Sequence, residues 1–155
     1  MSNMECIKRV LALSKGAVLM VFDEPVRSVK QASSVSGVSE SDIVKTVVVR
    51  GARGDYAVVV LGSCRVSLEK LGLALKDESL RLARAREVLE VTGYESGGVP
   101  PVCLDERVRT VIDKRVLERD YVVGGGGSTH ALLKLPVSLL LQFNSNPIVA
   151  DVSEC

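Results

Sequence analysis

The chain has 155 residues, of which 46% are hydrophobic and 25% are charged, so a disordered chain is excluded and one domain with a substantial core is expected. Aromatic residues make up 3% and Trp is absent, which leaves Val, Leu, Ile and Ala to fill the core. Twenty basic and nineteen acidic side chains give a net charge near +1, which excludes a protein that binds nucleic acid by bulk electrostatics alone. Basic residues within 76–86 and 107–119 alternate with acidic ones, as on solvated helix faces, so any contact with nucleic acid must be local.

The four cysteines, Cys6, Cys64, Cys103 and Cys155, are widely separated and form no Cys-x-x-Cys pair. Neither a secretory signal nor a long apolar span is present, which predicts a soluble, cytoplasmic protein with reduced thiols and no membrane partner. His130 is the single histidine, so we expect no metal and no other cofactor. Asn and Gln together number five, a scarcity typical of hyperthermophile proteins.

Hydrophobic periodicity and glycine or proline stops divide the first half of the chain. In chain order, they predict a helix over 4–14, a buried strand over 17–22, a turn over 23–25, a short helix over 29–35 that ends at Gly37, and a helix-start signal over 39–42. A strand over 43–50 then leads through a glycine-containing loop into an antiparallel strand over 56–61, and this hairpin is expected at the centre of the sheet.

The second half of the chain alternates helical and strand patterns. In chain order, it predicts helices over 67–75 and 78–92, an ordered loop over 93–101, strands over 108–112 and 121–123, a tight connection over 124–127, a strand over 129–135, a helix over 137–143 and a strand over 148–152. The fold class is therefore α+β: a single domain over 1–155 with a mixed, largely antiparallel, barrel-like sheet surrounded by helices.

Lys45 stands out because it interrupts an apolar strand. Side chains alternate between the two faces of a strand, so Ile43, Lys45, Val47 and Val49 share one face. A lysine in such a row must reach water, find an anionic partner or lose its proton, because desolvating an unpaired ammonium costs several kcal/mol. Taken alone, snorkelling to solvent is the favoured interpretation, and the alternative is a site that needs a cation.

Several segments together resemble the YbaK/prolyl-tRNA-synthetase-associated domain family, whose members hydrolyse mischarged aminoacyl-tRNA. Residues 29–33 and 43–48 are similar to the short helix and the lysine strand of that family, and residues 92–101 are similar to its glycine-proline loop, with the G-x-x-x-P spacing from Gly97 to Pro101. Segments 111–113, 121–126, 132–141 and 148–152 follow the C-terminal order of the family. The resemblance covers about residues 16–152.

The resemblance implies hydrolysis of the ester between an amino acid and the terminal ribose of tRNA. Backbone N–H groups of a glycine-rich loop can approach the developing oxyanion because no Cβ is in the way. Lys45 would contact the terminal adenosine or the carbonyl, so Lys45, Gly97 and Gly98 are the catalytic candidates. No general base is evident, and the family uses a substrate-assisted attack. The candidates for substrate binding are Thr46, Tyr94, Val99, Pro100, Pro101, Gly125, Gly126, His130 and Asp113, although a structural pairing of Asp113 with Lys114 or Arg115 is favoured.

We therefore expect a trans-acting deacylase in which a glycine-lined pocket accepts a small amino acid, Cys or Ala, mischarged on tRNA for proline. Its partners would be the acceptor end of aminoacyl-tRNA and an aminoacyl-tRNA synthetase; the oligomeric state is left open. One alternative is a non-catalytic module that binds an acceptor end or a partner protein. A second alternative is a cysteine hydrolase that uses Cys103, His130 and Asp113, although a buried structural thiol is the more usual role for such a cysteine.

Overall fold

The structure is a computed structural model that describes residues 3–155. Its α-helices are α1 (Asn3–Leu13), α2 (Val29–Ser36), α3 (Leu68–Leu75), α4 (Ala85–Thr92) and α5 (Ser138–Gln142), and its 3-10 helices are η1 (Glu40–Asp42) and η2 (Val116–Glu118). The strands are β1 (Val18–Val21), β2 (Val44–Gly51), β3 (Gly54–Leu61), β4 (Arg65–Val66), β5 (Arg81–Leu82), β6 (Val108–Asp113), β7 (Tyr121–Gly125), β8 (Ala131–Pro136), β9 (Ile148–Ala150) and β10 (Ser153–Glu154).

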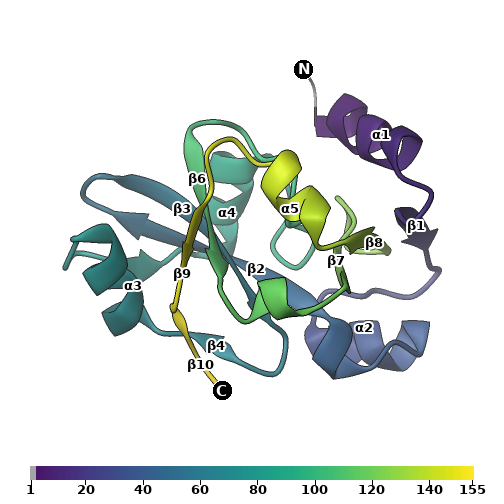
Figure 1. Ribbon diagram of the computed structural model, residues 1–155, viewed down its shortest axis with the longest axis horizontal. Helices are drawn as coiled ribbons and strands as arrows, with labels where there is room; N and C mark the ends of the chain where they lie inside the picture. Colours follow the sequence, from purple (N-terminus) through teal and green to yellow (C-terminus); the bar gives the residue numbers. More distant parts are fainter. Residues whose placement is uncertain (1–2) are drawn as a thin grey trace.

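The strands form a five-stranded sheet, a three-stranded sheet and a two-stranded pair. The five-stranded sheet has the order β5-β2-β3-β6-β9, with β2 and β3 as a central antiparallel hairpin and β6 parallel to both β3 and β9. The order β1-β8-β7 is antiparallel throughout, and Figure 1 shows this sheet with α1 at one end of the molecule and α3 at the other. The α+β class, the mixed sheet and the central hairpin are confirmed, whereas the division into separate sheets does not confirm a barrel-like closure.

Alternation along the central hairpin supplies side chains to both faces of the large sheet. Val49, Val58 and Val60 are buried in a cluster with Leu71 of α3. On the opposite face, buried side chains of β2 and β3 join others from α1, β6, β8 and α5 in the main core cluster. The aliphatic core predicted from the composition is therefore confirmed.

The helix predicted over 78–92 begins only at Ala85, and Arg81–Leu82 forms β5 instead. Although the segment has high helix propensity, the Ala83 N–H donates to the Val48 carbonyl at 2.9 Å and so extends the sheet beyond β2. Glu87 marks the helix start, because its carboxylate accepts from the Arg84 N–H at 3.0 Å. Arg81 and then Arg50 also bind this carboxylate and hold the pKa of Glu87 well below its ordinary value. Tertiary pairing thus overrides local propensity.

Two further strand predictions were wrong in detail. The predicted buried strand over 17–22 is the edge strand β1, in which Val18 is 45% and Val21 is 72% exposed. β1 lies at the edge of the three-stranded sheet and pairs only with β8, so its apolar sequence did not lead to burial of its side chains. The glycine run was predicted as a tight connection, but Gly124 and Gly125 belong to β7.

The prediction of reduced thiols was also wrong. Cys6 is bonded to Cys103 and Cys64 to Cys155, across sequence separations of 97 and 91 residues, with Cα–Cα distances of 5.7 Å and 4.1 Å. Only the tertiary fold brings these pairs within bonding distance, so the spacing of the cysteines could not reveal them. Within residues 3–155, no helix is long and apolar enough to cross a membrane.

Candidate functional site

A small pocket lies beside the junction of the two larger sheets. The sheets meet at a bridge between Ile43 and Val123, and the start of β2 and Gly124 and Gly125 of β7 all line the pocket. The N-terminal end of α2 and the loop around Gly97 complete its wall. The cavity measures about 60 Å³ and is lined by Val26, Arg27, Ser28, Val29, Ala32, Ile43, Val44, Lys45, Thr46, Gly97, Val99, Gly124, Gly125 and Leu132. This volume is far below the roughly 300 Å³ at which drug-sized ligand sites begin, so the pocket suits a small chemical group.

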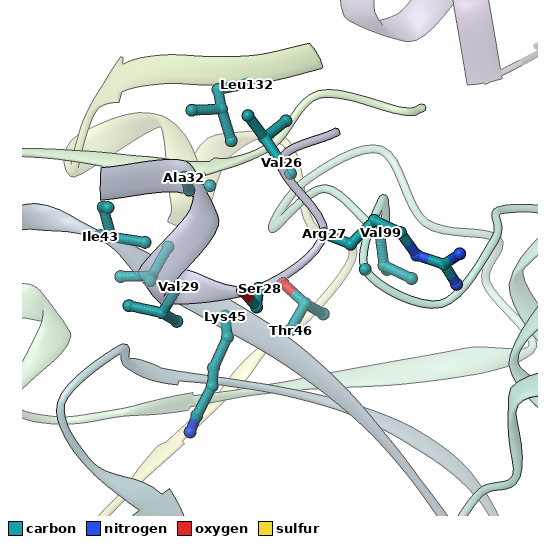
Figure 2. Close-up of a pocket in the computed structure, with 14 residues that line it drawn as sticks. Val26, Arg27, Ser28, Val29, Ala32, Ile43, Lys45, Thr46, Val99 and Leu132 are labelled. Atoms are coloured by element: carbon teal, nitrogen blue, oxygen red, sulfur yellow. The ribbon is translucent and has the colours of Figure 1, made fainter. Parts of the chain in front are cut away.

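Thr46 contributes a hydroxyl that lacks a partner. Among the described residues, its Oγ1 is the one buried side-chain oxygen or nitrogen without a hydrogen bond. Figure 2 shows this hydroxyl turned toward Ser28, on the wall formed by the start of α2. Leaving a buried hydroxyl unpaired costs about 1–3 kcal/mol, and such groups are rare in folded proteins. The hydroxyl is therefore available to a ligand.

Lys45 is half-buried on the neighbouring position of β2. Burial desolvates its ammonium and lowers the pKa of Lys45 below its ordinary value. No hydrogen bond or ion pair to this ammonium occurs within the described part of the chain. Figure 2 shows the side chain running away from Val26 and Leu132, so the ammonium lies at the edge of the pocket. The cation is thus uncommitted, and its flexible stem can bring it to an anionic ligand.

The predicted glycines differ in what their N–H groups can do. Gly97 lines the pocket, has a φ of 88° that favours glycine, and its N–H makes no hydrogen bond among the described residues. The Gly98 N–H already donates to the Glu95 carbonyl at 2.9 Å, and the Gly126 N–H to the Ala131 carbonyl at 2.9 Å. Gly125 lines the pocket as predicted, and a Cβ there would overlap the Val99 carbonyl. Gly97 is therefore the better candidate for an oxyanion donor.

The other predicted residues of the glycine-proline loop are buried. Val99 lines the pocket, whereas Pro100 and Pro101 do not. The Tyr94 hydroxyl donates to the Cys103 carbonyl at 3.4 Å, and burial raises the pKa of Tyr94 to about 12. These residues hold the loop in place, and the prediction that it is ordered agrees with their burial.

Three further candidates, from outside the glycine-proline loop, also do not line the pocket. His130 is exposed, and its Nδ1 is 3.1 Å from the Thr129 hydroxyl. Asp113 is fully buried, accepts from the Val152 N–H at 2.9 Å and is bridged to Arg115 at 3.4 Å, as the structural interpretation predicted. The cysteine-hydrolase alternative is overturned, because the Cys103 sulfur is held in a disulfide and no thiolate is available.

The sequence analysis missed Arg27 and Ser28, which lie at the pocket just before α2. Ser28 caps this helix, and its hydroxyl accepts from the Gln31 N–H at 3.1 Å. A serine before a predicted helix is a recognised cap signal, so this residue could have been found. Nothing local to the sequence places either residue opposite Thr46, because the contact depends on tertiary packing.

Comparison with known proteins identifies relatives over most of the chain. The family described as "Aminoacyl-tRNA editing domain" matches residues 23–143. A proline-tRNA ligase of Kosmotoga olearia is 34% identical over 110 residues, which make up 70% of this chain and 19% of that ligase. A proline-tRNA ligase of Thermosipho africanus is 37% identical over 106 residues, or 68% of this chain and 19% of the ligase. The chain thus spans about a fifth of the length of these relatives.

Two solved structures resemble the chain over its whole length. That of a hypothetical protein, APE2540, has 40% identity and a TM-score of 0.86, and the match covers 99% of this chain and 100% of that one. Another, of a protein described as a candidate trans-editing enzyme for prolyl tRNA synthetase, has 28% identity and a TM-score of 0.82, and covers 100% and 99%. Every residue that lines the pocket falls within the matched range of 23–143. The chain belongs to the aminoacyl-tRNA editing domain family.

Proposed function

We propose that the protein is a deacylase that hydrolyses the ester bond of mischarged aminoacyl-tRNA in the pocket between β2 and β7. The observation that carries this proposal is that two neighbouring residues of β2 both line one small pocket with an available polar group. The Thr46 hydroxyl has no hydrogen-bond partner, and the Lys45 ammonium has no anionic partner, among the described residues. Membership of the editing family supports the reaction class. The full-length similarity to a candidate trans-editing enzyme supports action on tRNA in trans, alongside a prolyl-tRNA synthetase.

The pocket supports a small amino acid as the group removed. Its volume of about 60 Å³ leaves room for a methyl or thiol side chain and excludes large ones. Most side chains that line it are aliphatic, among them Val29, Ala32 and Leu132. An apolar cavity of this size suits alanine or cysteine mischarged on tRNA for proline, and the Thr46 hydroxyl adds one position for a hydrogen bond.

The chemistry would depend on positioning and charge rather than on a protein base. Among the described residues that line the pocket, none is Asp, Glu, His or Cys, so the side chains there supply no conventional general base or thiol nucleophile. An aminoacyl ester is an activated substrate: water would attack its carbonyl with help from the neighbouring ribose hydroxyl, and the bond from the acyl carbon to the ribose oxygen would break, which releases the free amino acid and returns that oxygen to the tRNA as a hydroxyl. The Gly97 N–H would stabilise the resulting oxyanion, and Lys45 would contact the terminal adenosine or the ester carbonyl.

The direct test is release of amino acid from a panel of charged tRNAs. We expect the protein to release alanine or cysteine from tRNA for proline faster than spontaneous hydrolysis, and to leave prolyl-tRNA intact. Release is followed with labelled amino acid at neutral pH. Binding of charged tRNA without any release would instead favour a non-catalytic acceptor-end module.

Thr46→Val tests whether the unpartnered hydroxyl contacts the substrate. The change keeps the side-chain shape and removes one hydrogen-bonding group, so we expect kcat/KM to fall about tenfold, as for loss of a hydrogen bond of about 1.4 kcal/mol. Thermal stability should not fall, because the hydroxyl makes no hydrogen bond to any other group in residues 3–155. Both quantities are measured on purified variants, and a larger loss for cysteine than for alanine would place the bond on the substrate side chain.

Thr110→Val is the matched control. The Thr110 hydroxyl is buried and donates to Asn144 Oδ1 at 3.1 Å, away from the pocket. This variant should lose about 1–3 kcal/mol of stability and retain its activity. An unchanged rate in Thr46→Val, or a loss of stability as large as that of Thr110→Val, would contradict a substrate-binding role for Thr46.

A further inference from the structure

Arg27 lies at the junction of the two segments that close the pocket. It belongs to the turn before α2, where its N–H donates to Gln31 Oε1 at 3.1 Å. Its backbone packs against Gly97 so closely that a Cβ on that glycine would lie 2.7 Å from the Arg27 carbonyl oxygen. Its guanidinium donates through Nη2 to the Ser96 carbonyl at 3.2 Å. Arg27 therefore contacts the glycine-proline loop through both its backbone and its side chain.

Most of the hydrogen-bonding capacity of Arg27 is unused. A guanidinium carries five N–H donors, and the Ser96 carbonyl takes one of them. Within residues 3–155, no carboxylate is bridged to Arg27, although six other arginines, Arg50, Arg81, Arg86, Arg107, Arg115 and Arg119, have carboxylate partners. The side chain is exposed. An exposed arginine that is tethered by one bond but not neutralised is arranged to bind an anion.

The two cations at the pocket, Arg27 and Lys45, point in different directions (Figure 2). Figure 2 shows the Arg27 guanidinium extending past Val99, whereas the Lys45 ammonium extends in another direction, away from both. The two cations are thus placed to contact different parts of one substrate. A single-stranded acceptor end carries a phosphodiester immediately before its terminal nucleoside, and planar bidentate recognition of phosphate is a property of arginine rather than lysine.

We propose that Arg27 is a positioning residue that binds the last phosphodiester of the acceptor end and thereby fixes the Gly97 loop against the ester. This inference rests on the proposed deacylase function. The bound phosphate would complete the coordination of the guanidinium, whose bond to Ser96 then holds the adjoining Gly97 at the wall of the pocket. Arg27 thus couples recognition of nucleic acid to the geometry of the oxyanion donor without touching the reacting atoms.

The test compares substrates with and without that phosphodiester. Arg27→Gln and native protein are assayed on aminoacyl-tRNA, on an aminoacyl cytidylyl-adenosine dinucleotide and on aminoacyl-adenosine, which has no phosphate. We expect kcat/KM to fall about 10- to 100-fold on the first two substrates, as for loss of charge-assisted hydrogen bonds, and less than about twofold on the third. Arg27→Lys should recover only part of the loss, because it keeps the charge but not the planar fork.

Salt dependence and a control arginine complete the design. The slope of log(kcat/KM) against log[salt] is negative, and it should become less negative by about 0.7 in Arg27→Gln, the value for one single-strand phosphate contact. Arg53→Gln, in the hairpin loop at the far end of β2 from Lys45, should leave slope and rate unchanged. An equal loss on aminoacyl-adenosine would mean that Arg27 only braces the loop, and full activity on tRNA would overturn the proposal outright.

Binding of uncharged acceptor-end oligonucleotide separates this inference from the proposed function. Arg27→Gln should weaken that binding about 10-fold or more, measured by titration without any turnover. If native protein releases no amino acid but the oligonucleotide still binds through Arg27, the deacylase proposal fails and the phosphate site stands. If release occurs and binding is the same in both proteins, the phosphate site is wrong and the deacylase proposal stands.

Discussion

Replacing Lys45 with alanine is expected to lower kcat/KM for release of the mischarged amino acid by about 100-fold or more, the loss typical of removing a preorganised charge-stabilising group. Lys45 is half-buried and has no anionic partner within the described chain, and burial lowers its pKa. A substrate phosphate or developing oxyanion would therefore be the first strong partner of this ammonium. Release of labelled amino acid by native and variant protein measures the effect.

The design must separate loss of charge from loss of fold. Lys45→Met keeps an unbranched stem and should be as inactive as Lys45→Ala, while its melting temperature should equal or exceed that of the native protein, because a desolvated, unpaired ammonium has been removed. Lys134→Met is a matched control, since this lysine lies over the Tyr121 ring, 4.4 Å from its centroid, and does not line the pocket. Retained activity in Lys45→Met would show that the cation is not needed.

Removing either disulfide is expected to produce the largest loss of stability. Each closes a loop of more than ninety residues, with separations of 97 and 91, and restricting the unfolded chain to this extent is worth about 4–5 kcal/mol in the chain-entropy treatment. The Cys6→Ser/Cys103→Ser and Cys64→Ser/Cys155→Ser variants should each melt roughly 10–20 °C below the native protein. Denaturant titration and calorimetry measure the two quantities.

Reductant provides the control for this expectation. Thiol reductant should lower the melting temperature of the native protein toward that of a variant without either disulfide, and should have no further effect on that variant. Titration of free thiols in denaturant, before and after reduction, counts the bonds directly. Four free thiols before reduction would contradict both disulfides.

Much of the fold could be predicted from local patterns. The short helix that ends at Gly37 is present, and Gly37 has a φ of 76°, as a C-terminal glycine requires. The hairpin of β2 and β3 is also present, because the loop between them contains glycine and the flanking runs are rich in valine. Segments whose secondary structure depends on pairing with a distant part of the chain were predicted less well. The segment before Ala85 has helical composition, yet the edge of β2 draws it into the sheet.

The residues of the site also fall into those that local sequence could predict and those that depend on tertiary packing. The lysine strand and the glycine-proline loop identified Lys45, Gly97 and Val99, which the fold brings to one pocket. The sequence could not show that the Gly98 N–H is already used by Glu95. Nor could it show that Arg27 lies against Gly97, since 69 residues separate Arg27 from its hydrogen-bond partner Ser96. Availability of a donor is a property of the packed molecule rather than of residue type.

The two disulfides also have a consequence for a cleaved chain. Their spans overlap, because Cys64 lies between Cys6 and Cys103 while Cys155 lies beyond both. A single cut of the backbone at any position between Cys6 and Cys155 therefore leaves two fragments that are still covalently joined. A protease that nicks an exposed loop would release no strand and no helix from the domain. On a denaturing gel the nicked protein would migrate as one species without reductant and as two fragments with it, so the crossed bonds make the domain resistant to fragmentation as well as to heat.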